Sequence, residues 1–191
     1  STMISSPLHL LDCCVISDGA GAVVLTSPEV ARNTAKAPVW VIGSAESLEH
    51  IALGKHDVTL TAARRSGPRA FEQAGVTHRD IDMAMIYDSF TITVIANLED
   101  LGFCQKGEGG DFVSGGRIQL GGELPINTDG GGLSSNHPGM RGVFLLIEAT
   151  KQLRHEKGET QVPNCKIALC HGTGGRLATR HSGGTVILAR D

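Results

Sequence analysis

Three short stretches of the chain carry side chains that could act as acids, bases or nucleophiles. They are Tyr87-Asp88-Ser89-Phe90, Asn136-His137-Pro138 and Cys170-His171-Gly172-Thr173-Gly174-Gly175. An imidazole titrates near neutrality and can serve as a general acid or base. A phenol can donate to an oxyanion, and a thiol beside an imidazole is typical of acyl-transfer chemistry. The candidate catalytic residues are therefore Tyr87, His137, Cys170 and His171.

Glycine surrounds two of these stretches. Five glycines lie between Asn127 and Gly142, and a second cluster follows Cys170. Glycine lets the backbone come close to a ligand and point its N–H groups at it. The candidates for holding a substrate or an oxyanion are Asn127, Gly130, Gly131, Gly172 and Gly174.

Each candidate also has a purely structural interpretation. Tyr87 could be an aromatic residue at a strand end, Cys170 a small buried hydrophobe and His171 a histidine satisfied within the core. We expect either Asp88 or Ser89 to cap the helix that begins near Phe90.

The elements that would position these residues alternate between strands and helices. Apolar runs predict strands over residues 22–26, 38–44, 82–87, 166–170 and 184–190. Periodicity and capping signals predict helices over residues 28–33, 57–74 with a kink at Pro68, 90–101 and 143–153. The pattern indicates an α/β domain in which a mixed five-stranded sheet is layered with helices. Sites in such folds form at the carboxyl ends of strands, where the three stretches are expected to meet.

Composition excludes several classes of protein. The length of 191 residues suits one domain, taken as residues 1–191. The formal net charge of −3, with scattered Lys and Arg, gives no argument for binding to nucleic acid or to an anionic membrane. No apolar run is long enough to span a bilayer. The five cysteines include no CxxC pair, so we expect no metal site. We expect the cysteines to be free thiols in a reducing cytoplasm. Neither a P-loop nor a complete dinucleotide fingerprint is present, and we expect no covalently bound cofactor.

Five motifs in combination resemble the C-terminal half of thiolases, in particular the sterol-carrier-protein type. One is the closing strand and glycine turn Ala-Leu-Cys-His-Gly-Thr-Gly-Gly (168–175), which resembles the family's Cys- or His-containing turn. Tyr-Asp-Ser-Phe (87–90) resembles the family's His-Asp-Cys-Phe, and Leu-Gly-Phe-Cys (101–104) its Leu-Gly-Leu-Cys. Residues 127–138 resemble the glycine loop that leads to the family's His-Pro step. Ser17–Leu25 resembles a Ser-Asp-Gly-Ala-Ala-Ala strand, so the similarity covers nearly the whole chain.

The resemblance implies a thiolase-like C-terminal domain that handles a coenzyme A thioester. It implies that His137 activates a nucleophilic cysteine and helps to hold the thioester oxygen. Cys170, or alternatively His171, is the implied proton-shuttling acid/base, and Tyr87 occupies an oxyanion-hole position. The nucleophilic cysteine belongs to the family's N-terminal half, which is expected as a missing partner, so residues 1–191 alone should be inactive.

Two departures from the family leave the reaction open. Tyr87 replaces a histidine or asparagine, and a phenol has a pKa of ~10. The loop after His137 reads Pro-Gly-Met-Arg-Gly, which is one residue shorter than in thiolases and places Arg141 where they have a small residue.

Three functions therefore remain. The first is a thiolase-type acyltransferase related to acetyl-CoA acetyltransferase. The second is a thiolase-like retro-aldolase acting on β-hydroxyacyl-CoA in steroid or lipid side-chain degradation, which in that family works with an OB-fold partner protein. The third is a non-catalytic scaffold that binds acyl-CoA or a partner. The family also implies a homo-oligomer.

Overall fold

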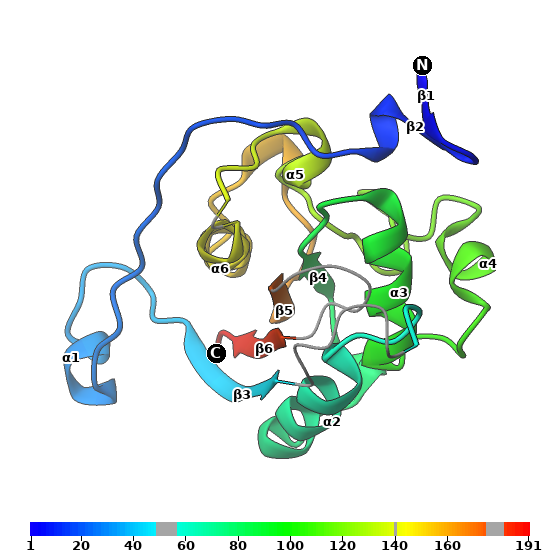
Figure 1. Cartoon of the computed structure of the whole chain (residues 1–191). Helices are drawn as coiled ribbons and strands as arrows, with labels where there is room; N and C mark the ends of the chain where they lie inside the picture. The colour runs from blue at the N-terminus through cyan, green and yellow to red at the C-terminus, as the bar shows by residue number, and fades with distance from the viewer. Residues whose placement is uncertain (49–56, 140, 175–181) are drawn as a thin grey trace.

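The computed structural model describes residues 1–48, 57–139, 141–174 and 182–191. The strands are β1 (Met3–Ser5), β2 (Leu8–His9), β3 (Trp40–Leu48), β4 (Met83–Ile86), β5 (Ile167–Gly174) and β6 (Ser182–Ala189). The α-helices are α1 (Pro28–Arg32), α2 (Ala63–Ala74), α3 (Thr91–Leu101), α4 (Gly109–Val113), α5 (Gly131–Ser134) and α6 (Gly142–Leu153) (Figure 1). Short 3-10 turns span Leu10–Asp12, His78–Asp80 and Gly158–Thr160. The predicted α/β class is confirmed.

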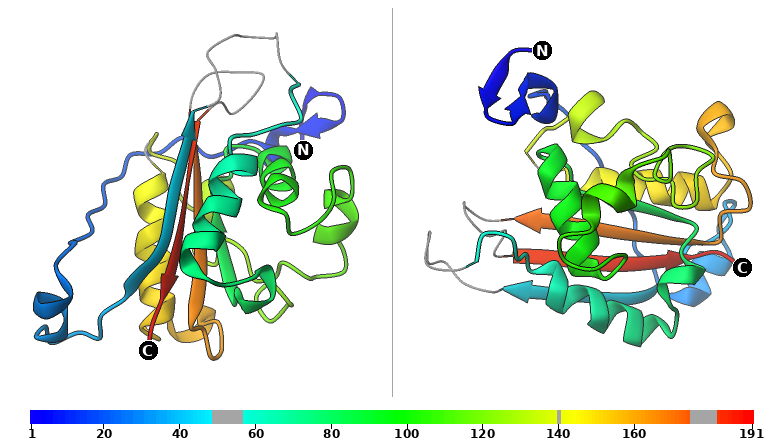
Figure 2. Two further views of the ribbon diagram at one scale, coloured as in Figure 1. Left: turned by 90° about the horizontal axis from the view of Figure 1, so that it is seen from below. Right: turned by 90° about the vertical axis from the view of Figure 1, so that its right-hand side faces the viewer.

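Four strands form one mixed sheet in the order β3-β6-β5-β4. Strand β6 runs antiparallel to both β3 and β5, and β5 runs parallel to β4. Helix α6 covers one face of this sheet, and α2 and α3 cover the other (Figure 2). Each face has its own apolar core. Met83, Met85 and Leu145 lie in the core under α6, and Ile86, Leu98 and Leu169 lie in the core under α2 and α3.

Local sequence explains where the helices start and stop. Helix α1 begins with Pro28, whose fixed φ suits a first helical position. Helices α2 and α3 end at Gly75 and Gly102, which adopt the left-handed conformation that glycine tolerates best. Helix α2 begins at Ala63, so it is shorter than the predicted helix over residues 57–74. Pro68 lies within it.

The predicted strand over residues 22–26 is wrong. These residues run as an extended segment outside the sheet, and Val24 and Leu25 are 88% and 81% exposed. The sheet therefore has four strands among the described residues instead of five. An apolar run indicates that a segment will be covered by something, but not that its own domain covers it.

The free edge of β4 is partly covered by a loop. The N–H of Ala84 donates to the carbonyl of Pro125 at 3.0 Å, and the N–H of Asn127 donates to the carbonyl of Ala84 at 3.1 Å. The first of the residues expected to hold a substrate, Asn127, is thereby fixed beside the strand that leads to Tyr87.

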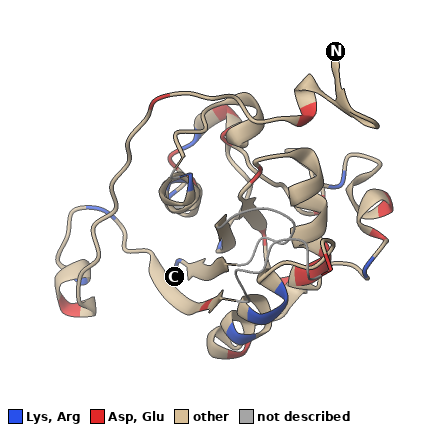
Figure 3. Ribbon diagram, in the orientation of Figure 1, with Lys and Arg blue, Asp and Glu red and all other residues tan. Residues whose placement is uncertain are grey.

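Charged residues are spread over most elements, and the basic ones are most concentrated on α2, which carries Arg64, Arg65 and Arg69 (Figure 3). Within the described part of the chain, no helix has the length and apolar character needed to cross a membrane.

Candidate active site

Tyr87 and His137 lie together at one edge of the molecule's central sheet. Tyr87 directly follows β4, and its N–H donates to the carbonyl of His171 on the parallel neighbour β5 at 2.9 Å. The rings of Tyr87 and His137 meet edge to face, with 5.2 Å between their centroids and 68° between their planes. A phenol and an imidazole that lie 50 residues apart in sequence are thus brought into contact.

His137 is held mainly through its backbone. Its N–H donates to Oγ of Ser17 at 3.0 Å. Its ring lies so close to Gly132 that a Cβ there would come within 2.8 Å of Cδ2. The ring atom Nε2 is buried and has no hydrogen-bond partner among the described residues. A buried polar atom without a partner costs free energy, and such atoms often have a functional reason.

Asp88 ties the Tyr87 turn to the His137 loop. Its carboxylate accepts hydrogen bonds from the N–H groups of Gly132 at 2.7 Å and Leu133 at 3.2 Å, at the start of α5. Burial raises the pKa of Asp88 above its ordinary value, against the lowering effect of these two donors. The expectation that Asp88 or Ser89 caps α3 is wrong, because its N-cap residue is Phe90, without a side-chain cap.

Asn127 has a structural task in this arrangement. Its side-chain oxygen accepts from the N–H of Ile86, and its side-chain nitrogen donates to the carbonyl of Ile86, both at 2.8 Å. The amide therefore acts as a substitute strand partner for the end of β4. Gly130, with φ of +90°, and Gly131, with φ of +66°, form the turn into α5.

Cys170 and His171 point to opposite faces of the sheet. We expected the strand to end at Cys170, but β5 continues to Gly174, and successive side chains of a strand alternate between its faces. The thiol of Cys170 lies under α6 and donates to the carbonyl of Leu145 at 3.5 Å. Burial raises its pKa strongly, which keeps the thiol protonated.

His171 lies on the other face, in a buried row of polar side chains. Its Nδ1 is 2.8 Å from Oγ1 of Thr185 on β6, and that hydroxyl is 2.8 Å from Oγ of Ser66 on α2. The imidazole is fully buried, and burial lowers its pKa to about 4, so it is neutral near pH 7. Gly172 and Gly174 are part of β5 and pair with Gly184 and Ser182 of β6.

Of the four predicted catalytic side chains, Tyr87 contacts His137 and also packs against the buried cluster that contains Cys170, whereas the imidazole of His171 lies on the other face of the sheet. The roles of all four stay predictions. In the described part of the chain, no group of three or more metal-ligating side chains occurs.

Arg141 is a residue of this region that sequence reasoning left without a role. Its side chain is fully buried and forms an ion pair with Asp129, with distances of 2.7 and 2.6 Å from one guanidinium nitrogen to the two carboxylate oxygens. The other terminal nitrogen donates to Asn136 at 2.9 Å. A signal was present in the sequence, because a cation at the start of a helix is unfavourable unless an anion lies nearby.

Comparisons with known proteins identify the fold. The Thiolase C-terminal domain-like family matches residues 43–190. The chain belongs to this family. An acetyl-CoA acetyltransferase of Methanothermobacter thermautotrophicus is 41% identical over 182 residues, which are 94% of this chain and 48% of that protein.

Two further relatives of this thiolase-like domain are aldolases. A steroid side-chain-cleaving aldolase of Thermomonospora curvata is 35% identical over 180 residues, covering 91% of this chain and 46% of that protein. The solved structure of an Ltp2-ChsH2(DUF35) aldolase superposes with a TM-score of 0.88 at 33% identity, over all of this chain and 50% of that one. The chain thus spans about half the length of the curated relatives it matches.

Proposed function

We propose that this domain supplies the acid–base groups of an acyl-CoA enzyme that cleaves or forms a carbon–carbon bond beside the thioester by retro-aldol chemistry. The observation that carries the proposal is the contact between Tyr87 and His137. Cys170 lies on the same face of the sheet as Tyr87, in the core under α6, and burial keeps its thiol protonated. We prefer the aldolase to the thiolase because Tyr87 stands where the resemblance to thiolases expects a histidine or asparagine.

The proposed reaction assigns one step to each residue. His137 takes the proton of the β-hydroxyl group, the bond between Cα and Cβ breaks, and a carbonyl product forms. The Tyr87 phenol donates to the thioester oxygen, on which the negative charge of the enolate develops. The proton on His137 then passes to Cα and yields the shortened acyl-CoA.

The test uses the complete protein with whatever subunits it requires. Wild type should cleave a β-hydroxyacyl-CoA without added free coenzyme A. His137→Gln should lower kcat by about 10²–10⁴-fold, the usual contribution of general acid–base catalysis. Tyr87→Phe, which removes a single hydroxyl, should lower kcat by about 10²-fold or more.

Cys170→Ala is the matched control and should leave the retro-aldol rate within a few-fold of wild type. A large loss of cleavage in this variant, with its folding intact, would contradict the assignment of the chemistry to Tyr87 and His137.

Thiolase-type acyl transfer is the second candidate, favoured by the 41% identity to a protein named acetyl-CoA acetyltransferase. Its nucleophile would come from the half that this chain does not span. Turnover of a β-ketoacyl-CoA that depends on free coenzyme A, together with an acyl-enzyme trapped by mass spectrometry, would favour it. Tight acyl-CoA binding without any turnover would instead favour a scaffold.

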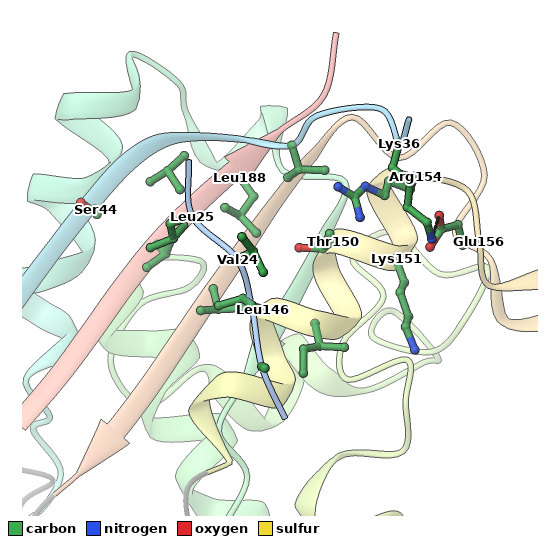
Figure 4. Close-up of a pocket in the computed structure, with 16 residues that line it drawn as sticks. Val24, Leu25, Lys36, Ser44, Leu146, Thr150, Lys151, Arg154, Glu156 and Leu188 are labelled. Atoms are coloured by element: carbon green, nitrogen blue, oxygen red, sulfur yellow. Dashed lines mark hydrogen bonds and ion pairs between the residues drawn. The ribbon is translucent and has the colours of Figure 1, made fainter. Parts of the chain in front are cut away.

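We further propose that an N-terminal thiolase half covers the open side of α6. There, residues 22–25, α6 and the sheet enclose an apolar groove of about 620 Å³ (Figure 4). Val24, Leu25 and Leu146 line it, and Lys36, Arg154 and Glu156 lie at one end. An OB-fold partner, a cytoplasmic location and a role in lipid metabolism belong to the same proposal and rest on the resemblance to the aldolases.

A further inference from the structure

The buried ion pair of Arg141 joins three points of the loop that carries His137. Asp129 lies at the start of this loop, Arg141 lies at its end where α6 begins, and Asn136 directly precedes the histidine. The guanidinium group of Arg141 contacts the other two positions, through two bonds to Asp129 and one to Asn136. Hydrogen bonds between charged groups are the strong ones, and their fork geometry fixes orientation as well.

Besides the ion pair, the loop is held by the bonds of Asp88 to Gly132 and Leu133 and by the short helix α5, and it is rich in glycine. Gly130, Gly131 and Gly139 all have positive φ angles, and glycine pays a larger entropic cost on being ordered than any other residue. Asp129 Oδ1 also accepts the N–H of Gly131 at 2.9 Å, so the ion pair orders the glycine turn as well. Removing the guanidinium would release both ends of the loop at once.

The position of the His137 ring depends on this backbone. Ser17 binds the main-chain N–H of His137, and the ring nitrogen Nε2 has no partner among the described residues. The side chain therefore follows wherever residues 129–141 place it. An error of about 1 Å in the position of a catalytic group can cost about 10²-fold in rate.

We infer that Arg141 is a positioning residue: through Asp129 and Asn136 it holds the loop in the conformation that presents His137 to Tyr87. The inference rests on the proposed function of those two residues. Arg141 itself is fully buried and does not bind the substrate, so its effect passes through the loop.

The experiment compares Arg141→Lys, Arg141→Leu and Asn136→Ala in the complete protein. Arg117→Leu is the control, because Arg117 forms an exposed ion pair with Glu123 outside the site. Hydrogen exchange of the peptides that cover residues 129–141 and the kinetics of β-hydroxyacyl-CoA cleavage are measured together.

Arg141→Lys should keep the positive charge but lose the forked N–H donors of the guanidinium group. Hydrogen exchange in the loop should therefore rise about 10-fold, and kcat should fall about 10–100-fold with little change in KM. Asn136→Ala should show the same pattern at smaller amplitude, and Arg117→Leu should match wild type. A spread of faster exchange over the whole domain would indicate a general loss of stability and overturn the inference.

Unchanged loop exchange and unchanged kcat in Arg141→Lys would also overturn it. If Arg141→Leu does not fold, Asn136→Ala decides, because it leaves the ion pair with Asp129 in place. If wild type itself has no retro-aldol turnover, the proposed function fails. Exchange in the loop, and the NMR signal of the His137 ring beside Tyr87, then still report whether Arg141 holds this conformation.

Discussion

At residue 131 the backbone leaves no room for a side chain. Gly131 has a φ angle of +66°, and a Cβ at this position would overlap the carboxylate of Asp88. The same carboxylate accepts the N–H of the next residue, Gly132, so it cannot move away without losing that bond. The close approach is part of what links the Tyr87 turn to the His137 loop.

Gly131→Ala should therefore lower the free energy of unfolding by roughly 2–4 kcal/mol, through backbone strain and displacement of Asp88. Chemical denaturation monitored by circular dichroism would measure it. Gly110→Ala is the matched control, because a Cβ there meets nothing within 4 Å and φ is not positive. That variant should be neutral or slightly more stable, since alanine favours a helix. Equal effects of the two substitutions would contradict the close-approach argument.

The geometry of strands explains which site residues could be predicted from the sequence. Tyr87 and His137 were expected to meet because strand ends gather at one edge of a sheet. The thiol–imidazole pair of Cys170 and His171 was expected only because the strand was ended too early. Because both residues lie within β5, their adjacent side chains point to opposite faces of the sheet. The position of Arg141 at the start of a helix indicates that an anion lies nearby, but Asp129 has no helical or strand spacing to it, so no local pattern names the partner.

At the scale of elements, a buried polar row joins β5, β6 and α2. It consists of His171, Thr185 and Ser66, all fully or almost fully buried. Because burial lowers the pKa of His171 from 6.5 to about 4, the unfolded chain binds a proton in the range between these values and the folded chain does not. Stability is then fully present above pH 6.5 and is lost as pH falls toward 4.

The span between those two pKa values corresponds to roughly 3 kcal/mol of unfolding free energy. His171→Gln should remove this share of the pH dependence, so that the variant loses less stability than wild type between pH 7 and pH 4.5. His155→Asn is the control, since His155 is exposed and its positive φ of 56° suits asparagine. Identical pH slopes for wild type and His171→Gln would refute the role of the buried imidazole.

Most elements were predictable because their signals are local. Proline at the start of α1, left-handed glycines after α2 and α3, and the capping box of Thr77 and Asp80 all act within a few residues. Residues 22–26 were mistaken for a strand of this sheet, because hydrophobicity does not say which surface buries a segment. The hairpin of β1 and β2 was missed, since its strands are too short to show alternation.

At the scale of the whole molecule, one side of α6 is apolar and open. Val24 and Leu25 are 88% and 81% exposed, and they line the groove of Figure 4. Contiguous exposed apolar surface of this kind favours association. We therefore expect isolated residues 1–191 to self-associate through this side.

Val24→Asp should reduce the association measured by light scattering across a concentration series. It should change the free energy of unfolding by only about 0.5 kcal/mol, because the side chain is exposed. Leu120→Asp is the control: Leu120 is 48% exposed and lies outside the groove, and its substitution should leave association unchanged. A monomer at every concentration for the wild-type fragment would contradict the expectation.

The five cysteines of this protein fall into two groups that should react with a thiol reagent at different rates. Cys13, Cys14 and Cys104 are half-buried, whereas Cys165 and Cys170 are buried. Burial raises the pKa of the Cys104 thiol, and it raises those of Cys165 and Cys170 strongly, that of Cys165 to about 12. An alkylating reagent consumes thiolate, so it should modify three positions early and the other two only when the structure opens. The Cys170 thiol donates to the carbonyl of Leu145 in α6. The rate at which Cys170 is labelled, measured by mass spectrometry, would therefore report how often α6 separates from the sheet.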